Sequence, residues 1–297
     1  MAQIRTPAGL EIEYDTFGAS SDPPLLLIMG FGAQMIGWSS PFCQQLADAG
    51  RFVIRFDNRD CGLSSKMDGQ QVDLNQVIAH VSAGEFDAAR ELIPYSIEDM
   101  VGDAIALLDG LQSPRAHVVG SSMGGVIAQV MASEYPDRVL TLTSMMSTTG
   151  EPHVGQSSPE AMRALFTPSP SDREGFIQAA VKSAVWSSKK YFDPEETRKR
   201  AAESYDRSYY PEGAARQIAA LIANGSRETA LKSLTVPTLV IHGLDDTLIP
   251  PSGGQRTAEL APNARLLLLQ DMGHDRPRPL WPQICGAIIE HTASASF

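Results

Sequence analysis

Cysteine is scarce in this chain, with only three among 297 residues. Cys43, Cys61 and Cys285 are odd in number, far apart and outside the C-x-x-C spacing of zinc sites and redox motifs. We therefore expect buried or free thiols in a reducing compartment, with neither a disulfide framework nor a metal site.

A long apolar run is also missing. No stretch approaches the roughly 20 apolar residues that a membrane-spanning helix needs. The first residues, Met-Ala-Gln-Ile-Arg, lack the apolar core of a signal peptide. The expectation is a cytoplasmic protein without a membrane span.

Positive charge is in deficit. The chain has 24 Lys and Arg against 35 Asp and Glu, a formal net charge of -11. Nucleic-acid binding needs a basic stripe for the phosphates, so no nucleic-acid partner is expected. The densest basic stretch, residues 189–200, is interleaved with acidic residues and indicates a solvated helix face. The oligomeric state stays unknown from the sequence.

Apolar residues make up 43% of the chain, enough for one large core. Uniformly apolar runs indicate strands that are buried on both faces, as in a parallel sheet covered by helices on each side. Such runs occur at residues 25–29, 52–56, 117–119, 139–145, 237–242 and 264–270. An antiparallel hairpin is predicted from residues 2–6 and 12–16.

Helical patterns lie between these strands. The clearest spans residues 96–111, with Ser96 as N-cap and Asp99 three positions later. A final helix is predicted over 282–291, followed by a tail, 292–297, that is expected to fray. The alternation predicts an α/β fold with a mostly parallel central sheet.

The interval 147–234 breaks this alternation, because it contains no buried-strand run. It opens with a Pro-, Ser- and Gly-rich stretch to residue 171. Helical patterns follow at 172–187, 194–209, 211–224 and 226–234. We predict a core formed by residues 1–146 and 235–297, and a helical cap formed by 147–234, because insertions at this end of an open α/β sheet lie beside the ligand crevice. The alternative is a solvated helical layer without a functional role.

The motif Gly120-Ser121-Ser122-Met123-Gly124 follows an apolar run and leads into a helical segment. This is the strand–G-x-S-x-G–helix pattern of a nucleophile elbow, and it predicts Ser122 as a nucleophile. Glycines are needed on both sides because side chains there would collide with the strained turn. The N-terminus of the following helix points its N–H groups towards a developing oxyanion.

A serine nucleophile needs a base, and six histidines are available. His274 is favoured because it lies on a turn just beyond the predicted strand 264–270, from which it can reach the elbow. His242 ends a strand near the same sheet edge and stays an alternative. The other four are predicted to be structural or in segments without a motif: His80, His117, His153 and His291.

An acid must orient that base, and two adjacent aspartates compete for the role. Asp245 and Asp246 both follow the strand that ends at His242. Neighbours on a turn point in different directions, so only one can face His274. The spacing from Gly243 favours Asp246.

An oxyanion hole needs two backbone N–H groups. Met123 supplies one as the residue after the nucleophile, and Phe31 in Gly30-Phe31-Gly32 is predicted to supply the other, although an ordinary turn explains those glycines equally well. Candidate residues of an apolar substrate pocket are Gly30, Trp38, Met145, Trp186 and Tyr209, for which core packing is the alternative.

Together these residues resemble the α/β-hydrolase superfamily over essentially the whole chain. More narrowly, the chain is similar to bacterial esterases grouped with aclacinomycin methylesterase and mycobacterial lipase-type carboxylesterases. The motifs that carry this resemblance lie at residues 27–38, 55–65, 120–125, 205–211, 243–250 and 272–274. The resemblance implies a Ser122–His274–Asp246 triad with Phe31 and Met123 as oxyanion hole. Two positions depart from the wider superfamily pattern: Met29 replaces a common histidine, and Asp60 replaces a common glycine.

The sequence therefore predicts a serine carboxylesterase without cofactor, acting on a hydrophobic ester with a methyl or short to medium acyl group through an acyl-enzyme. A lactonase or C–C bond hydrolase on the same triad is one alternative. It is ranked lower because Gln34 is the only polar side-chain candidate near the oxyanion loop. A ligand-binding homologue without catalysis is another alternative.

Overall fold

The computed structural model describes residues 2–168 and 170–294. Its strands form one sheet in the order β1-β2-β4-β3-β5-β6-β7-β8. The first two strands run antiparallel to their neighbours, and the remaining pairs are parallel. The strands are β1 (Ala2–Arg5), β2 (Glu11–Phe17), β3 (Pro24–Ile28), β4 (Phe52–Phe56), β5 (Ala116–Ser121), β6 (Val139–Met145), β7 (Thr238–Gly243) and β8 (Arg265–Leu269).

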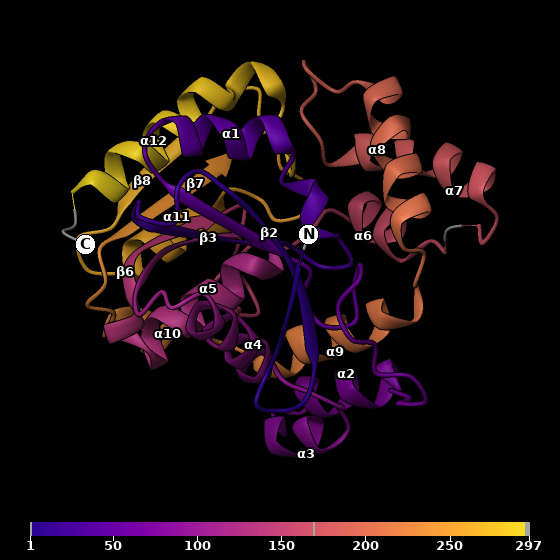
Figure 1. The fold of residues 1–297 in the computed structure, drawn as a ribbon. Helices are drawn as coiled ribbons and strands as arrows, with labels where there is room; N and C mark the ends of the chain where they lie inside the picture. Colours follow the sequence, from indigo (N-terminus) through magenta and orange to yellow (C-terminus); the bar gives the residue numbers. More distant parts are fainter. Residues whose placement is uncertain (1, 169, 295–297) are drawn as a thin grey trace.

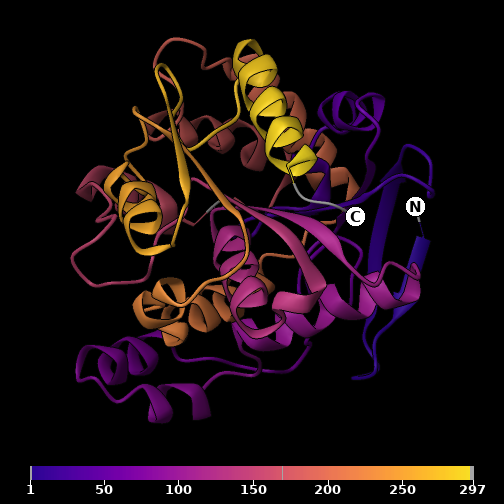
Figure 2. The same cartoon turned by 90° about the vertical axis from the view of Figure 1, so that its left-hand side faces the viewer.

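The central strands are buried on both faces, as their apolar runs predict. Leu25 and Leu27 of β3 enter one core cluster, whereas Leu26 and Ile28 enter the other, because successive side chains point to opposite faces. Figures 1 and 2 show α1 (Ser40–Asp48) and α12 (Trp281–Ala293) on one side of the sheet. The opposite side carries α4 (Ile97–Gly110), α5 (Met123–Glu134) and α11 (Ser252–Leu260). The predicted α/β-hydrolase architecture is confirmed.

Helix α4 begins where its sequence signal places it. The Ser96 hydroxyl accepts the Asp99 N–H, and the Asp99 carboxylate accepts the Ser96 N–H, which completes a capping box. At the other end of the chain, α12 extends to Ala293, two residues beyond its predicted end. The tail predicted to fray starts at residue 292, but residues 292 and 293 are helical, and residues 295–297 lie outside the described residues.

Helices fill the interval between β6 and β7, and no strand occurs in its described residues. They are α6 (Pro159–Phe166), α7 (Arg173–Ala179), the 3-10 helix η3 (Ala180–Val185), α8 (Pro194–Arg207), α9 (Glu212–Asn224) and α10 (Glu228–Lys232). Helix α6 lies in the Pro-, Ser- and Gly-rich stretch up to residue 171, where no helix is predicted from the sequence. Its start signal is Ser158 as N-cap with Pro159 at the first helical position.

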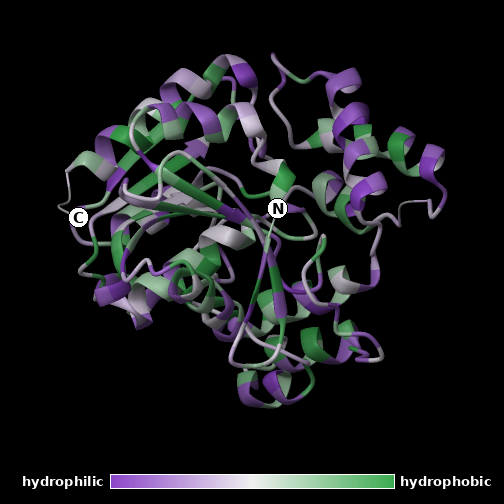
Figure 3. Cartoon of the chain, viewed as in Figure 1, coloured by the Kyte–Doolittle hydropathy of each residue, from purple (hydrophilic) through white to green (hydrophobic). Residues whose placement is uncertain are grey.

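The inserted helices divide into two groups. Helix α7 packs on α8, and α6, α7 and α8 all pack on η3, to the right of the sheet in Figure 1. Helix α9 packs on α4 and on the short helices α2 (Leu74–Ser82) and α3 (Phe86–Glu91), while α10 packs on α5 and α11. In Figure 3 the strands are largely hydrophobic, whereas α8 is largely hydrophilic. Short 3-10 helices complete the fold: η1 (Met35–Gly37), η2 (Pro136–Arg138) and η4 (Arg278–Leu280).

Two buried ion pairs join the inserted helices to the loop after β4. Arg207 at the end of α8 lies 2.7 Å from the carboxylate of Asp57. Arg216 of α9 lies 2.7 Å from the carboxylate of Asp60, and both side chains are almost fully buried. Asp60 adopts a φ of 63°, the left-handed conformation that favours the glycine of the wider pattern. The ion pair with Arg216 gives a physical reason for an aspartate in place of the common glycine, because the Asp60 carboxylate anchors α9.

Candidate active site

Ser122 lies on the sharp turn between β5 and α5. Its backbone has φ 57° and ψ -119°, a strained conformation for a residue with a side chain. Hydrogen bonds hold it there: the Ser122 N–H donates to Met145 O at 2.9 Å, and the Ser122 carbonyl accepts from the Ser147 hydroxyl at 2.9 Å. The strain is thus sustained by the surrounding sheet edge.

The glycines of the motif have a steric reason. A Cβ atom on Gly120 would collide with the carbonyl oxygen of Gly124, across the turn. A Cβ atom on Gly124 would collide with the carbonyl oxygen of Ile28 at the end of β3. Both obstacles are backbone atoms, so the elbow excludes side chains at these positions.

His274 bridges Ser122 and Asp246. Its Nε2 atom lies 3.0 Å from the Ser122 hydroxyl oxygen, and its Nδ1 atom lies 2.7 Å from Asp246 Oδ2. The loop that carries His274 follows β8, and the His274 N–H donates to Trp186 O at 2.6 Å. The structure thus brings together the three side chains that the motifs single out.

Asp246 is fully buried, and its two oxygens have separate partners. Oδ1 accepts the N–H groups of Leu248 and Ile249 at 2.9 and 2.8 Å, which leaves Oδ2 for His274. Burial by itself raises the pKa of Asp246, but the positive charge on a protonated His274 and the proximity of His242 outweigh it and hold the pKa below its usual value. The carboxylate is therefore ionised at neutral pH.

The two competing candidates lie elsewhere. Asp245 is partly exposed and accepts the Lys189 N–H at 3.4 Å. His242 is fully buried, and its Nε2 atom donates to Ile249 O at 2.7 Å, with Asp246 Oδ2 at 3.6 Å. His242 therefore packs behind the carboxylate that faces His274.

The predicted oxyanion donors lie on the loop after β3, which carries Phe31, and at the start of α5, which carries Met123. Met123 is the first residue of α5, where an N–H has no partner within its helix. Among the described residues, neither the Met123 nor the Phe31 N–H donates a backbone hydrogen bond. Gly30 lies against Ser122, since a Cβ atom there would sit 3.1 Å from Ser122 Cβ. Gly30 thus leaves room for the nucleophile beside the loop.

Inserted helices hold the loop that carries the predicted oxyanion donor Phe31 from two sides. The Gly32 N–H donates to Gln217 Oε1 of α9 at 2.9 Å, and Gln217 Nε2 donates to Arg59 O at 2.9 Å. From α8, Arg207 donates to Gln34 Oε1 at 2.7 Å, while the Gln34 amide donates to Ser208 O at 2.8 Å. Gln34 is therefore engaged with the protein.

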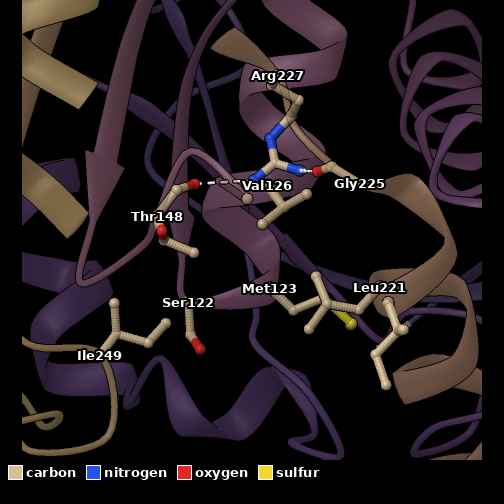
Figure 4. Close-up of a pocket in the computed structure, with 10 residues that line it drawn as sticks. Ser122, Met123, Val126, Thr148, Leu221, Gly225, Arg227 and Ile249 are labelled. Carbon is tan, nitrogen blue, oxygen red and sulfur yellow. Dashed lines mark hydrogen bonds between the residues drawn. The ribbon is translucent and has the colours of Figure 1, made fainter. Parts of the chain in front are cut away.

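A cavity of about 230 Å³ opens beside Ser122. Its wall is mostly apolar, and one guanidinium faces it (Figure 4). It is lined by Ser122, Met123, Val126, Thr148, Gly150, Leu221, Ile222, Gly225, Arg227 and Ile249. Six of these residues belong to the interval 147–234, so the inserted segment forms much of the wall.

None of the five residues predicted for the pocket is among those that line this cavity, although Gly30 lies against Ser122. Trp38 and Met145 are fully buried in the core, where the Arg276 guanidinium lies 4.0 Å from the centre of the Trp38 ring. Tyr209 packs on Tyr205, with ring centres 4.7 Å apart. Trp186 contributes its carbonyl to the His274 loop. Trp38 and Met145 therefore fit the core-packing alternative. Their residue types do not distinguish the two environments, because large apolar side chains occur both in cores and in apolar pockets.

Eight of the lining residues were not predicted: Val126, Thr148, Gly150, Leu221, Ile222, Gly225, Arg227 and Ile249. They come from several segments, and apart from Ile249, which lies in the motif at 243–250, no motif contains any of them. The one sequence signal for a pocket position is that Thr148 and Ile249 follow shortly after predicted strands, where ligands bind in open α/β sheets.

Other kinds of site are sparse in the described structure. No group of three or more His, Cys, Asp or Glu residues in that part of the chain is placed to hold a metal ion. The described helices include none with the length and apolarity to cross a membrane. The three cysteines are buried and unpaired, and burial raises the pKa of Cys61 to about 12.

Comparison with known proteins agrees with this architecture. Residues 23–275 match the family described as alpha/beta hydrolase fold. The chain is 30% identical to rhodomycin D methylesterase DnrP of Streptomyces peucetius over 94% of both chains.

Solved structures with the same fold include the meta-cleavage product hydrolase CumD of Pseudomonas fluorescens IP01. It superimposes with a TM-score of 0.76 at 22% identity, covering 100% of this chain and 98% of that one. An enol-lactonase of Burkholderia xenovorans LB400 superimposes with a TM-score of 0.74 at 22% identity, covering 98% and 100%. The fold, the family match and the relative at 30% identity lead to one conclusion: this chain belongs to the alpha/beta hydrolase fold family.

Proposed function

We propose that this protein is a serine carboxylesterase that hydrolyses hydrophobic esters through Ser122, His274 and Asp246. The observation that carries the proposal is the continuous chain from Ser122 Oγ to His274 Nε2 at 3.0 Å and from His274 Nδ1 to Asp246 at 2.7 Å. A serine hydroxyl is a weak nucleophile unless a base takes its proton, and this arrangement provides an oriented base.

The reaction follows from these contacts. Ser122 Oγ attacks the ester carbonyl while His274 Nε2 takes the hydroxyl proton, and the Phe31 and Met123 N–H groups stabilise the oxyanion. His274 then gives that proton to the departing alcohol, which leaves an acyl group on Ser122. A water molecule loses a proton to His274 and attacks the acyl-enzyme; His274 then returns the proton to Ser122 Oγ as the carboxylic acid leaves. Asp246 keeps the proton on His274 Nδ1 throughout.

The cavity supports a hydrophobic substrate of short to medium length. Its wall is mostly apolar, and about 230 Å³ is too small for a bulky acyl group. We also propose that the inserted segment, residues 147–234, selects the substrate, since Leu221, Ile222 and Gly225 line the cavity. Similarity to a methylesterase supports ester hydrolysis. The cytoplasmic location expected from the sequence stays a prediction.

A lactonase or C–C bond hydrolase with the same triad is the second candidate. The sequence offered Gln34 as its polar substrate contact, but the side chain of Gln34 is bound by Arg207, Ser204 and Ser208. Ester hydrolysis therefore accounts better for the site.

A panel of 4-nitrophenyl esters with increasing acyl length tests the proposal, with Ser122→Ala as control. We expect turnover of short to medium esters and a loss of about 10⁴- to 10⁶-fold in kcat for the folded variant. A folded wild-type protein that hydrolyses none of these esters, or a Ser122→Ala variant that keeps a tenth of the activity, would contradict it.

A further inference from the structure

Arg227 lines the cavity from the side away from the nucleophile. Its side chain is buried, with a residue exposure of 7%, and it enters from the turn between α9 and α10. Figure 4 shows Val126 and Thr148 between Arg227 and Ser122, so the cavity has a nucleophile towards one end and a cation towards the other.

Every hydrogen-bond acceptor that Arg227 contacts is neutral. Nε donates to Gln129 Oε1 at 2.9 Å, and Nη2 donates to Thr148 O at 2.8 Å. Nη1 donates to Asn224 Oδ1 at 2.5 Å and to Gly225 O at 3.0 Å. A guanidinium has five N–H donors, so these four bonds leave one N–H of Nη2 without an acceptor among the described residues.

The positive charge of Arg227 also lacks a carboxylate partner in the described part of the chain. The acidic side chain that acts on it is Glu98, which is reached only through Asn224, whose amide donates to Glu98 at 3.1 Å. Burial lowers the pKa of Arg227 to about 10, and the group therefore stays charged at neutral pH. The other buried arginines of the inserted helices differ, because Arg207 and Arg216 each face an aspartate.

A buried charge normally has a partner of opposite charge, because its desolvation is otherwise uncompensated. We propose that Arg227 binds a carboxylate on the substrate, so that the preferred esters carry an anionic group at the end of the acyl chain distant from the scissile carbonyl. The apolar residues Met123, Val126 and Leu221 would then contact the chain between the two ends. This inference rests on the proposed ester hydrolysis at Ser122.

Two esters of nearly equal length test the inference: mono-4-nitrophenyl glutarate, which ends in a carboxylate, and 4-nitrophenyl pentanoate, which ends in a methyl group. The measured quantity is the ratio of their kcat/KM values, divided by the same ratio for hydrolysis by hydroxide. We expect the wild type to favour the glutarate by about 10- to 100-fold, as a charge-assisted hydrogen bond allows. Arg227→Gln should abolish this preference mainly by raising KM for the glutarate.

The ratio is taken on one enzyme preparation, so it is independent of the fraction that is folded. Arg227→Lys keeps the charge and should keep part of the preference, and Arg173→Gln, which removes an exposed charge on α7, should leave it unchanged. Equal ratios for Arg227→Lys and Arg227→Gln would overturn the inference.

A wild type without preference for the glutarate would overturn it too, even if no Arg227 variant folds. In that case turnover of the pentanoate would leave the proposed esterase function intact. A folded wild type that hydrolyses neither ester would instead refute the proposed function.

Discussion

Replacing Asp246 by asparagine should disable the base without changing the shape of the site. In the structure Oδ1 of Asp246 accepts two backbone N–H groups, from Leu248 and Ile249, while Oδ2 accepts from His274 Nδ1. An asparagine keeps its oxygen on the two N–H groups, because the opposite orientation would place its amide donors against both. Its NH₂ group then faces His274 and forces the imidazole proton onto Nε2.

That tautomer cannot accept the proton of Ser122, since Nε2 is the atom 3.0 Å from the hydroxyl. The expected loss is about 10⁴ in kcat, which corresponds to about 5 kcal/mol in the activation free energy. KM should change little because Asp246 is fully buried and does not line the cavity.

The matched control is Asp245→Asn, one residue earlier on the same loop, where the carboxylate is partly exposed and accepts the Lys189 N–H at 3.4 Å. Its kcat should stay within about tenfold of the wild type. Both variants are compared on one 4-nitrophenyl ester at one pH, with circular dichroism to verify folding. A mild Asp246→Asn and a severe Asp245→Asn would refute the assignment, and two mild variants would place the orienting acid elsewhere.

Three further outcomes follow from the contacts. His274→Ala should lower kcat by about 10⁴-fold or more, whereas His242→Ala should reduce stability and change kcat by less than about tenfold; swapped phenotypes in the ester assay would contradict this assignment. Arg207→Met should lower the free energy of unfolding, measured in urea, by about 3–5 kcal/mol, because the fully buried Asp57 loses its ion-pair partner. A change below about 1 kcal/mol would show that the ion pair does not anchor α8. Burial and nearby positive charges lower the pKa of His117 to about 4, so the unfolded state binds more protons than the folded state between about pH 6.5 and pH 4. The free energy of unfolding should therefore fall by at most about 3 kcal/mol as the pH drops through that window. His117→Gln should reduce this fall, and an equal pH dependence of the free energy of unfolding in both proteins, measured by urea titration, would contradict it.

The sheet could be read from the sequence because its strands are buried on both faces. A uniform apolar run such as Leu25–Ile28 has one stable placement, between two helical layers. The elbow could be read because Gly120 and Gly124 face backbone atoms, which makes glycine obligatory. Helix α6 could not be predicted in this way, since it is short and mostly exposed, with Ala161 as its buried residue, and only its N-cap signal marks it.

The cavity wall could not be predicted in the same way. Arg227, Leu221 and Ile249 meet only because α9 and the loops after β6 and β7 converge in space. Nothing local distinguishes a tryptophan that lines a pocket from one that fills a core, so Trp38 was assigned to the pocket although it is fully buried.

The central claim is that Ser122 is the nucleophile, and covalent labelling tests it most directly. A fluorophosphonate that reacts with activated serines is incubated with the protein, and the adduct is located by intact mass and peptide mapping. We expect one adduct per chain, on Ser122, formed in parallel with the loss of ester hydrolysis and absent in Asp246→Asn on the same time scale. Complete inhibition with the label on another residue, or undiminished hydrolysis by a fully labelled Ser122, would contradict it.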